Sequence, residues 1–193
     1  MRRFSEANFQ KDTCFLFGSG GTHGGQVLVY RRIPSPLDGS LEEVAQGKLT
    51  NSSAPHSSSY TSEKAVDGLI DDANMYHSGT LVKPWWWVDL GEEKIIYQIQ
   101  IYPRQSSLYD HRFHDVEVRV GNILINHGNF SSYTLLCTYE KVYVRSEGQL
   151  LCTRYNGVNG RYVSIQIIDT ASAILQVNEV AVHALKINDS RVV

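Results

Sequence analysis

The feature of this chain that most constrains its fold is a run of three consecutive tryptophans, Trp85, Trp86 and Trp87. An extended strand directs successive side chains to opposite faces of a sheet, so the run loads both faces with large aromatic surface. One face can enter a core while the other covers the outside of the sheet. Residues 89–91 (Asp-Leu-Gly) follow as a predicted turn, and the β-branched and aromatic stretch 95–102 predicts the next strand. The run therefore predicts the middle of an all-β domain.

Short strand-like runs recur after the tryptophans, and helical periodicity is nearly absent. We expect strands at 95–102, 115–120, 133–138, 141–145, 161–168 and 179–187. Turn signals separate them, at 121–122, 127–129, 156–157 and 159–160. Several short strands with turns at such spacing predict a β-sandwich or barrel.

The first forty residues differ from the rest in composition. Residues 13–17 and 26–33 predict two strands on either side of the glycine-rich stretch 18–25. That stretch lacks the Gly-Lys-Ser/Thr ending and the following helix of a phosphate-binding loop, so we interpret it as a flexible hairpin or linker. A Pro- and Ser-containing boundary follows at 34–40. We therefore expect an N-terminal extension (1–40), a β domain (41–186) and a tail (187–193).

Charge and composition exclude several classes of function. A net charge of −2 and a pI near 6.4 argue against a nucleic-acid partner. No stretch approaches the ~20 apolar residues of a transmembrane helix. The first eight residues lack the apolar region of a secretory signal. The chain has no Gly-x-Ser-x-Gly, His-Glu-x-x-His or Cys-x-x-Cys motif. Asp71 and Asp72 are adjacent acids, not a separated acid/base pair. We therefore expect a binding module, not an enzyme.

A series of short motifs occurs in a defined order along the β domain. Its members are 47–50, 65–68, 76–77, 84–91, Arg104, Arg112, 116–121, 160–163 and 177–182. This series resembles the coagulation factor 5/8 type C (discoidin-like) domains and, among them, the fucose-binding F-type lectins, over about residues 42–186. The resemblance implies an eight-stranded jelly-roll β-sandwich whose binding loops gather at one end.

The resemblance also implies a sugar site made of one histidine and two arginines. The family's spacing between the histidine and the first arginine selects His77 and Arg104. The second arginine, Arg112, comes one residue late, which a one-residue insertion in the loop explains. An arginine presents a rigid fork of donors to neighbouring hydroxyls, and neutral histidine offers one donor and one acceptor. A different alignment of Tyr76-His77 leaves the ligand histidine absent.

Two departures from the family pattern affect specificity. The family's Arg-Gly-Asp is Arg104-Gln105-Ser106 here, and its sugar-contacting cysteine pair is replaced at 107–109. We expect Leu108 or Tyr109 to cover the apolar face of a deoxy sugar, and a specificity altered from simple fucose.

The residues alone allow a second interpretation of the same loop. Arg104 and Arg112 can be solvated, or one of them can pair with Asp110 or Asp115 at small energetic consequence. His111 and His114 suggest a metal pair, but a third ligand at a fixed spacing is missing.

Similar lectins hold a calcium ion near the base of the binding loops, so the resemblance implies Ca²⁺ as a cofactor. Hard oxygen ligands at flexible geometry suit this ion. The matching carboxylates are Asp67 and Glu179. The matching backbone carbonyls and further ligands are Lys64, Leu69, Ser78 and Asn178. The alternative is that Asp67 only caps a turn before Gly68.

Three cysteines are too few for a disulfide scaffold. Cys137 and Cys152 bracket a predicted hairpin and match a family disulfide, which leaves Cys14 over. A disulfide implies an oxidising compartment. Three glycosylation-type triplets, at Asn51, Asn129 and Asn188, agree with secretion.

The expected function is therefore a secreted, calcium-containing lectin for fucosylated or related glycans on glycoproteins or cell surfaces. The alternative is a discoidin-like adhesion or receptor module that binds protein or lipid, for which 81–83 (Leu-Val-Lys) is the one candidate apolar spike. A carbohydrate-binding module attached to an enzyme is a third possibility.

Overall fold

The computed structural model describes residues 41–186, and within this range the chain is all-β. The strands are β1 (Leu41–Glu43), β2 (Leu49–Ser52), β3 (Tyr76–His77), β4 (Leu81–Val82), β5 (Trp85–Pro103), β6 (Val116–Gly121), β7 (Thr134–Tyr139), β8 (Leu150–Ile167), β9 (Ser172–Ala173) and β10 (Gln176–Leu185). Three 3-10 helices lie in the connections: η1 (Ser62–Val66), η2 (Asp110–Arg112) and η3 (Arg145–Glu147). Within residues 41–186, no helix has the length and apolar character needed to span a membrane.

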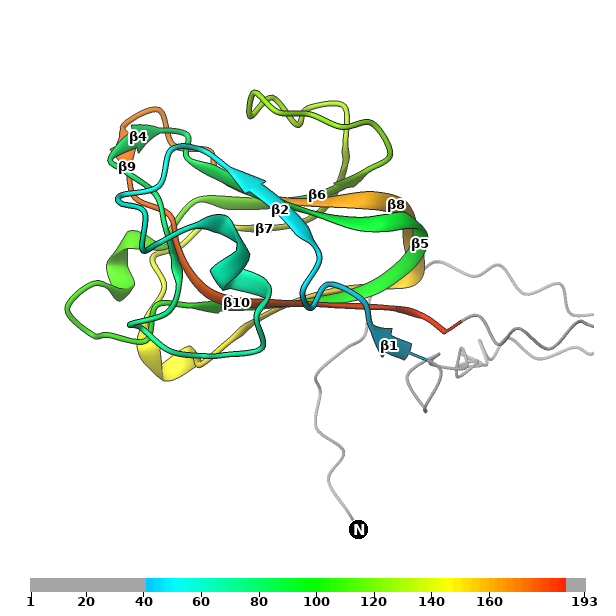
Figure 1. The fold of residues 1–193 in the computed structure, drawn as a ribbon, viewed down its shortest axis with the longest axis horizontal. Helices are drawn as coiled ribbons and strands as arrows, with labels where there is room; N and C mark the ends of the chain where they lie inside the picture. Colours follow the sequence, from blue (N-terminus) through cyan, green and yellow to red (C-terminus); the bar gives the residue numbers. More distant parts are fainter. Residues whose placement is uncertain (1–40, 187–193) are drawn as a thin grey trace, which may run out of the picture. The chain divides into compact units, whose positions relative to one another are not determined.

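Two long strands, β5 and β8, bend so that each contributes to both layers of a sandwich (Figure 1). In one layer the first part of β5 lies between β2 and the last part of β8, which continues to β6 and β7. In the other layer the second part of β5 lies between the first part of β8 and β10, which continues to β1. The continuous sheet has eight strands, and the predicted all-β sandwich is confirmed.

The bend of β5 falls where the sequence predicts a turn. The pairing of β5 with β8 breaks register between Asp89 and Lys94, and Gly91 adopts a positive φ of 88° that glycine tolerates without strain. The Asp89 carboxylate accepts a hydrogen bond from the Gly91 N–H at 2.8 Å. The chain therefore changes layer here without leaving the sheet, so the predicted turn is a bend within one strand.

The three tryptophans divide between the two faces of β5 as the alternation predicts. Trp86 is fully buried in the main core, where its indole N–H donates to the Ser62 carbonyl at 2.9 Å. Trp87 is buried in a second apolar cluster on the other face, and Trp85 packs against that cluster. The loop before β7 covers this outer face through Ile125, Phe130 and Tyr133. The tryptophans therefore join the sandwich core to a loop that covers its outside.

Other predictions agree less closely with the structure. The predicted strand at 141–145 is wrong: this segment has no strand partner and leads into η3. The turns predicted at 156–157 and 159–160 are also wrong, because β8 runs through both. The predicted disulfide between Cys137 and Cys152 is confirmed and joins β7 to β8. The strands predicted at 13–17 and 26–33, together with Cys14 and the 187–193 tail, lie outside the described residues.

Candidate functional site

The candidate site lies at one end of the sandwich, where β3, the end of β5 and the start of β10 meet. His77 of β3 pairs with Gln176 of β10, and Val177 pairs with Pro103 at the end of β5. Arg104 follows Pro103 directly, and Arg112 ends η2 in the next loop. The sheet register thus brings together side chains from three separate parts of the sequence.

His77, Arg104 and Arg112, which we call the basic cluster, converge on one oxygen atom. The Gln176 carboxamide, turned so that its oxygen faces the three donors, accepts from His77 Nε2 at 2.7 Å, Arg104 Nη1 at 3.1 Å and Arg112 Nη1 at 3.2 Å. The opposite orientation would set its NH₂ group against the same donors, so the hydrogen-bond network selects this one. The three residues that the sequence predicts therefore gather around one buried side-chain oxygen.

Tyr109 supports both arginines of the basic cluster. The centroid of its ring lies 4.2 Å from the Arg104 guanidinium carbon and 4.5 Å from that of Arg112. Stacking of guanidinium on an aromatic ring is favourable and fixes the plane of the donor fork. Leu108 beside it is 73% exposed. Of the two predicted apolar contacts, Tyr109 thus packs on the arginines, and Leu108 is the side chain directed to solvent.

His77 is the buried member of the basic cluster. Its ring stacks on His56, with centroids 4.7 Å apart, and contacts Tyr60 at 5.3 Å. Burial lowers the pKa of His77, and the charges of His56, Arg112 and Arg104 lower it further. Its Nδ1 lies 2.6 Å from the Ser78 carbonyl, which can only accept, so Nδ1 carries the hydrogen. Nε2 can therefore donate to Gln176 as well only when the ring is charged.

Arg104 is anchored on its other side by Asp72. The Asp72 carboxylate lies 3.7 Å from Arg104 Nε and accepts from the Gln105 N–H at 2.7 Å and the Asn178 side-chain amide at 2.9 Å. Within residues 41–186, Arg104 Nε has no hydrogen-bond acceptor although it is buried.

The predicted alternative, in which an arginine pairs with Asp110 or Asp115, is wrong. The Asp110 carboxylate accepts from the backbone of His111 and Arg145, and Asp115 contacts His114.

The two predicted calcium carboxylates, Asp67 and Glu179, lie close to each other. Glu179 Oε2 accepts from the Gly68 N–H at 3.2 Å, which sets it beside Asp67. Burial raises the pKa of Glu179 to about 7, and the Asp67 charge contributes. Asp67 also makes the predicted turn, since it accepts from the Leu69 N–H at 3.0 Å and from the Asn74 side-chain amide at 2.5 Å. Two acidic groups with few counter-charges are a donor set that suits a hard cation such as Ca²⁺.

The remaining predicted calcium ligands divide into two groups. Lys64 in η1 and Leu69 flank Asp67 in the chain, and Asn178 adjoins Glu179, with its side-chain Oδ1 buried and accepting no hydrogen bond from residues 41–186. Ser78 lies elsewhere: it bonds to Leu175, the residue just before β10 and four residues before Glu179, and its hydroxyl accepts from the Leu175 N–H. At roughly 3.3 Å per residue this is too far for a shared ion, so Ser78 does not join the carboxylates.

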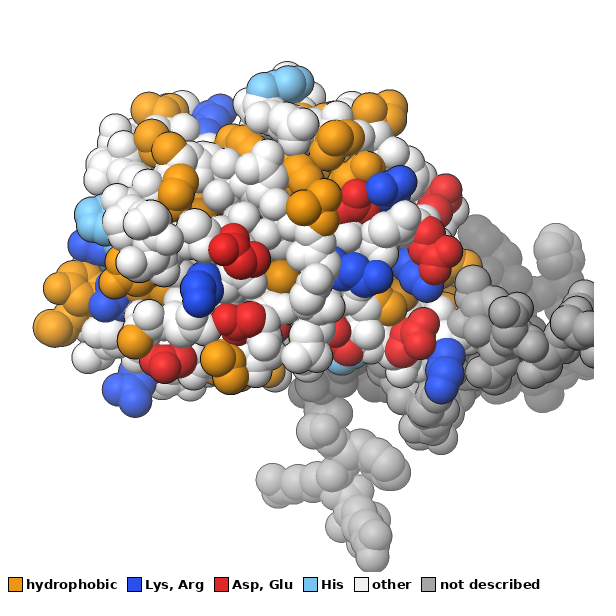
Figure 2. Space-filling view, in the orientation of Figure 1, with side chains coloured by type: hydrophobic (Ala, Val, Ile, Leu, Met, Phe, Trp, Pro, Cys, Tyr) orange, Lys and Arg blue, Asp and Glu red, His pale blue; other side chains and the backbone are white. Residues whose placement is uncertain are grey.

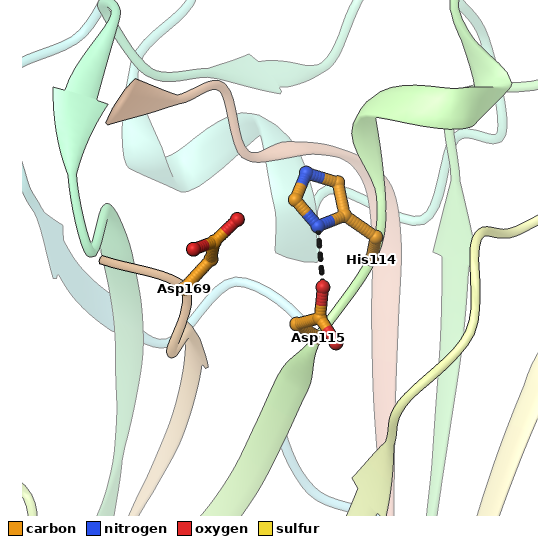
Figure 3. A group of neighbouring side chains, drawn as sticks. All are labelled: His114, Asp115 and Asp169. Carbon is orange, nitrogen blue, oxygen red and sulfur yellow. Dashed lines mark hydrogen bonds and ion pairs between the residues drawn. The ribbon is translucent and has the colours of Figure 1, made fainter. Parts of the chain in front are cut away.

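A second group of side chains carries atoms of the kind that ligate metals (Figure 3). Ligand atoms of His114, Asp115 and Asp169 lie within 4.8 Å of one another. His114 Nδ1 contacts Asp115 Oδ2 at 2.9 Å, and the Asp169 carboxylate accepts from the Ala171 N–H at 3.0 Å. Local contacts already account for this group. The suggested partner His111 is not among its members.

Sequence reasoning missed four residues that complete the site: Gln176, Asp72, His56 and Tyr60. Gln176 is the first residue of β10, and the sequence alone does not show which side chains it contacts. His56 and Tyr60 lie in the Ser-rich stretch 52–62, whose composition indicates only a loop. A polar residue at the start of a buried strand is the one clue that could have found Gln176.

Solved structures of similar fold include three lectin-type proteins. A fucolectin from Morone saxatilis (striped bass) serum is 24% identical over 76% of this chain and 48% of its own, with a TM-score of 0.65. The lectin binding domain of lectinolysin, as a histidine mutant complexed with Lewis b, is 20% identical over 74% of this chain and 96% of its own (TM-score 0.61). A Streptococcus pneumoniae fucose binding module is 21% identical over 75% and 99%, respectively (TM-score 0.60). A comparison with curated protein sequences found no match.

Fold and site together define a discoidin-like β-sandwich module with a cluster of basic side chains at its loop end. The family model for the F5/8 type C domain matches residues 48–180, well over half of the chain, and the protein therefore belongs to the F5/8 type C domain family.

Proposed function

We propose that this domain binds carbohydrate through the basic cluster of His77, Arg104 and Arg112. One observation carries the proposal: side-chain nitrogens of His77, Arg104 and Arg112, from three separate segments, lie within 3.2 Å of the Gln176 side-chain oxygen. A surface loop of solvated arginines would not hold its donors on a common point. Donor groups held close together in this way suit a ligand with closely spaced oxygens.

The chemistry of the basic cluster favours a neutral sugar hydroxyl. The guanidinium groups of Arg104 and Arg112 can only donate, and hydroxyl oxygens can accept from them. A single hydroxyl can accept a hydrogen bond from either arginine without bringing a charge into the site. Acidic and basic side chains lie interspersed on the face shown in Figure 2, so that face presents no single-sign field for a polyanion. We therefore assign neutral glycans as the ligand class.

Fucose-type specificity is the finer part of the proposal. It is supported by the residue pattern of the basic cluster and by the names of similar structures, which include a fucolectin and a fucose binding module. In this proposal Leu108, exposed beside the arginines, covers the apolar face of the sugar. Calcium held by Asp67 and Glu179 would stiffen the loops beneath the site, and the Cys137–Cys152 disulfide supports an extracellular setting.

A glycan array with and without calcium tests the proposed function. We expect fucosylated or related glycans to bind the parent, and Arg104→Ala to lose about 1.5–3 kcal/mol through the missing charged donor. Arg104→Lys should be nearly as damaging because an ammonium cannot span two hydroxyls. Arg154→Lys, an exposed arginine of β8, is the matched control. Equal array binding by Arg104→Ala and the parent would place the ligand elsewhere.

Exposed apolar side chains support the alternative function, an adhesion module that binds lipid. Val82 of β4 is 61% exposed, and Ile123 and Leu124 are exposed in the loop that follows β6. A module that binds lipid would insert such side chains. Co-sedimentation with phosphatidylserine vesicles, lost on Val82→Asp and Ile123→Asp but kept in Arg104→Ala, would favour this function over sugar binding.

A further inference from the structure

Gln176 lies at the centre of the basic cluster, yet it is only 1% exposed. As the first residue of β10 it is paired with His77, so the sheet itself fixes its backbone. Its carboxamide oxygen accepts from one donor on β3, one at the end of β5 and one on η2. A single rigidly held atom thus links all three side chains that the proposed sugar site needs.

More hydrogen-bond donors face this oxygen than it has lone pairs to accept them. A carbonyl oxygen offers two lone pairs, whereas three donors lie within 3.2 Å of it. His77 can donate from Nε2 only when its ring is charged, because Nδ1 already donates to Ser78. The two arginines therefore occupy the oxygen when His77 is neutral, and the third hydrogen bond forms only when His77 is charged.

The neutrality of the amide matters as well. A carboxylate at this position would form a buried ion pair with both guanidinium groups and hold their donors inward. A carboxamide accepts from the same groups but leaves their charge uncompensated, so they remain able to donate to a ligand. The Tyr109 ring steadies the guanidinium planes from the side without competing for their donors.

We infer that Gln176 is a positioning residue that gathers His77, Arg104 and Arg112 into one ligand-binding arrangement while keeping their donors available. The identity of the ligand rests on the proposed function, whereas the gathering of the three side chains does not. Removal of the amide should let the like-charged arginines separate and should change the titration of His77.

The experiment compares Gln176→Met, which keeps the length of the side chain and removes its acceptor, with Gln176→Glu, which keeps the acceptor and adds charge. Gln100→Met is the matched control, since Gln100 is a half-buried glutamine of β5 that contacts His183 instead. Each variant is titrated with L-fucose, and the pKa of His77 is followed by NMR of its ring, assigned with His77→Asn. Thermal melting monitors folding.

We expect Gln176→Met to weaken L-fucose binding about tenfold or more and to lower the pKa of His77, because the charged ring loses an acceptor. Gln176→Glu should raise that pKa and also weaken binding, and Gln100→Met should change neither. If Gln176→Met retains both L-fucose binding and the His77 titration of the parent, the inference is overturned. If the parent itself binds no L-fucose, the proposed function fails and the His77 titration alone decides the role of Gln176. If Gln176→Met does not fold, the direction of the shift in Gln176→Glu decides it.

Discussion

Arg161 holds Asp89 with two hydrogen bonds at the bend of β5, from Nε to Oδ1 at 2.6 Å and from Nη2 to Oδ2 at 2.8 Å. Asp89 is the last paired residue of β5 before the bend, and its partner on β8 is Tyr162, the neighbour of Arg161. The ion pair therefore ties the two long strands together at the point where they change layer.

The Asp89–Arg161 ion pair should make the stability of the folded domain depend on pH in the acidic range. The hydrogen bonds from Arg161 lower the pKa of Asp89 in the folded protein. A carboxyl with a lowered pKa contributes stability above its unfolded value of roughly 3.9 and loses it as the pH falls through the folded value. We expect Asp89→Asn to melt below the parent at pH 7 and the difference to shrink toward pH 3. A difference that stays constant with pH would assign the effect to packing.

Tyr109 should matter for ligand binding through its ring and not its hydroxyl. Each guanidinium that stacks on it gains on the order of 0.5–1 kcal/mol. Tyr109→Leu should therefore weaken L-fucose binding by about 1–2 kcal/mol, whereas Tyr109→Phe should bind nearly as the parent does. Isothermal titration of the three proteins checks this. Equal affinities for the Leu and Phe variants would show that the ring does not hold the arginines.

Calcium should stabilise the folded domain through Asp67 and Glu179. A ligand that binds only the native state raises the melting temperature as its excess over the dissociation constant grows. We expect millimolar Ca²⁺ to raise the melting temperature of the parent above that in chelator, and Asp67→Asn or Glu179→Gln to abolish the increase. Glu140→Gln, at an exposed position, is the control. Absence of a shift, with no metal by elemental analysis, contradicts the site.

When a chelator has removed calcium, ionisation of the Glu179 carboxyl should make the domain less stable as the pH rises. Glu179 has a pKa of about 7 in the fold, against roughly 4.3 in an unfolded chain. Between these values the folded state holds more protons than the unfolded state, so stability falls from pH 5 to pH 7. Glu179→Gln should remove this slope, and saturating calcium should remove most of it. Denaturant unfolding at several pH values measures the effect.

The Cys137–Cys152 disulfide should leave one reactive thiol in each chain of three cysteines. Thiol titration of the unfolded, unreduced protein should find one, and Cys14→Ser should find none. Reduction should lower the free energy of unfolding by about 3 kcal/mol for a loop of this size. Three thiols before reduction would contradict the pairing in solution.

Much of the fold follows from alternation that the sequence displays directly. The tryptophan run predicts one face in the core and one outside because the period of a strand is fixed by its backbone, and Trp86 and Trp87 lie as this requires. The 141–145 segment shows the limit of the same signal. Val142 and Val144 are exposed while Tyr143 between them is buried, which is a strand's pattern, yet Tyr143 reaches the core from a loop. The alternation of exposed and buried residues thus indicates which side chains are buried, but not whether the backbone pairs with another strand.

The candidate site could be predicted in part for a related reason. His77, Arg104 and Arg112 follow from a residue pattern with its spacing, and the structure brings them together. Gln176 could not be found this way, because its role depends on the register that sets β10 opposite β3. Ser78 was predicted as a calcium ligand but does not lie beside Glu179. It directly follows His77, and β3 runs antiparallel to β10, so Ser78 lies opposite Leu175 instead.

The pairing of Leu41 with Leu185 places the first and last strands of the described domain side by side, at the end of β10 opposite Gln176. Nine residues of strand, roughly 30 Å, separate that edge from the basic cluster. A tether at the β1–β10 edge would therefore be attached at the end of β10 away from the basic cluster. If the basic cluster binds sugar as proposed, several copies tethered at this edge to one support would gain avidity without any new contact.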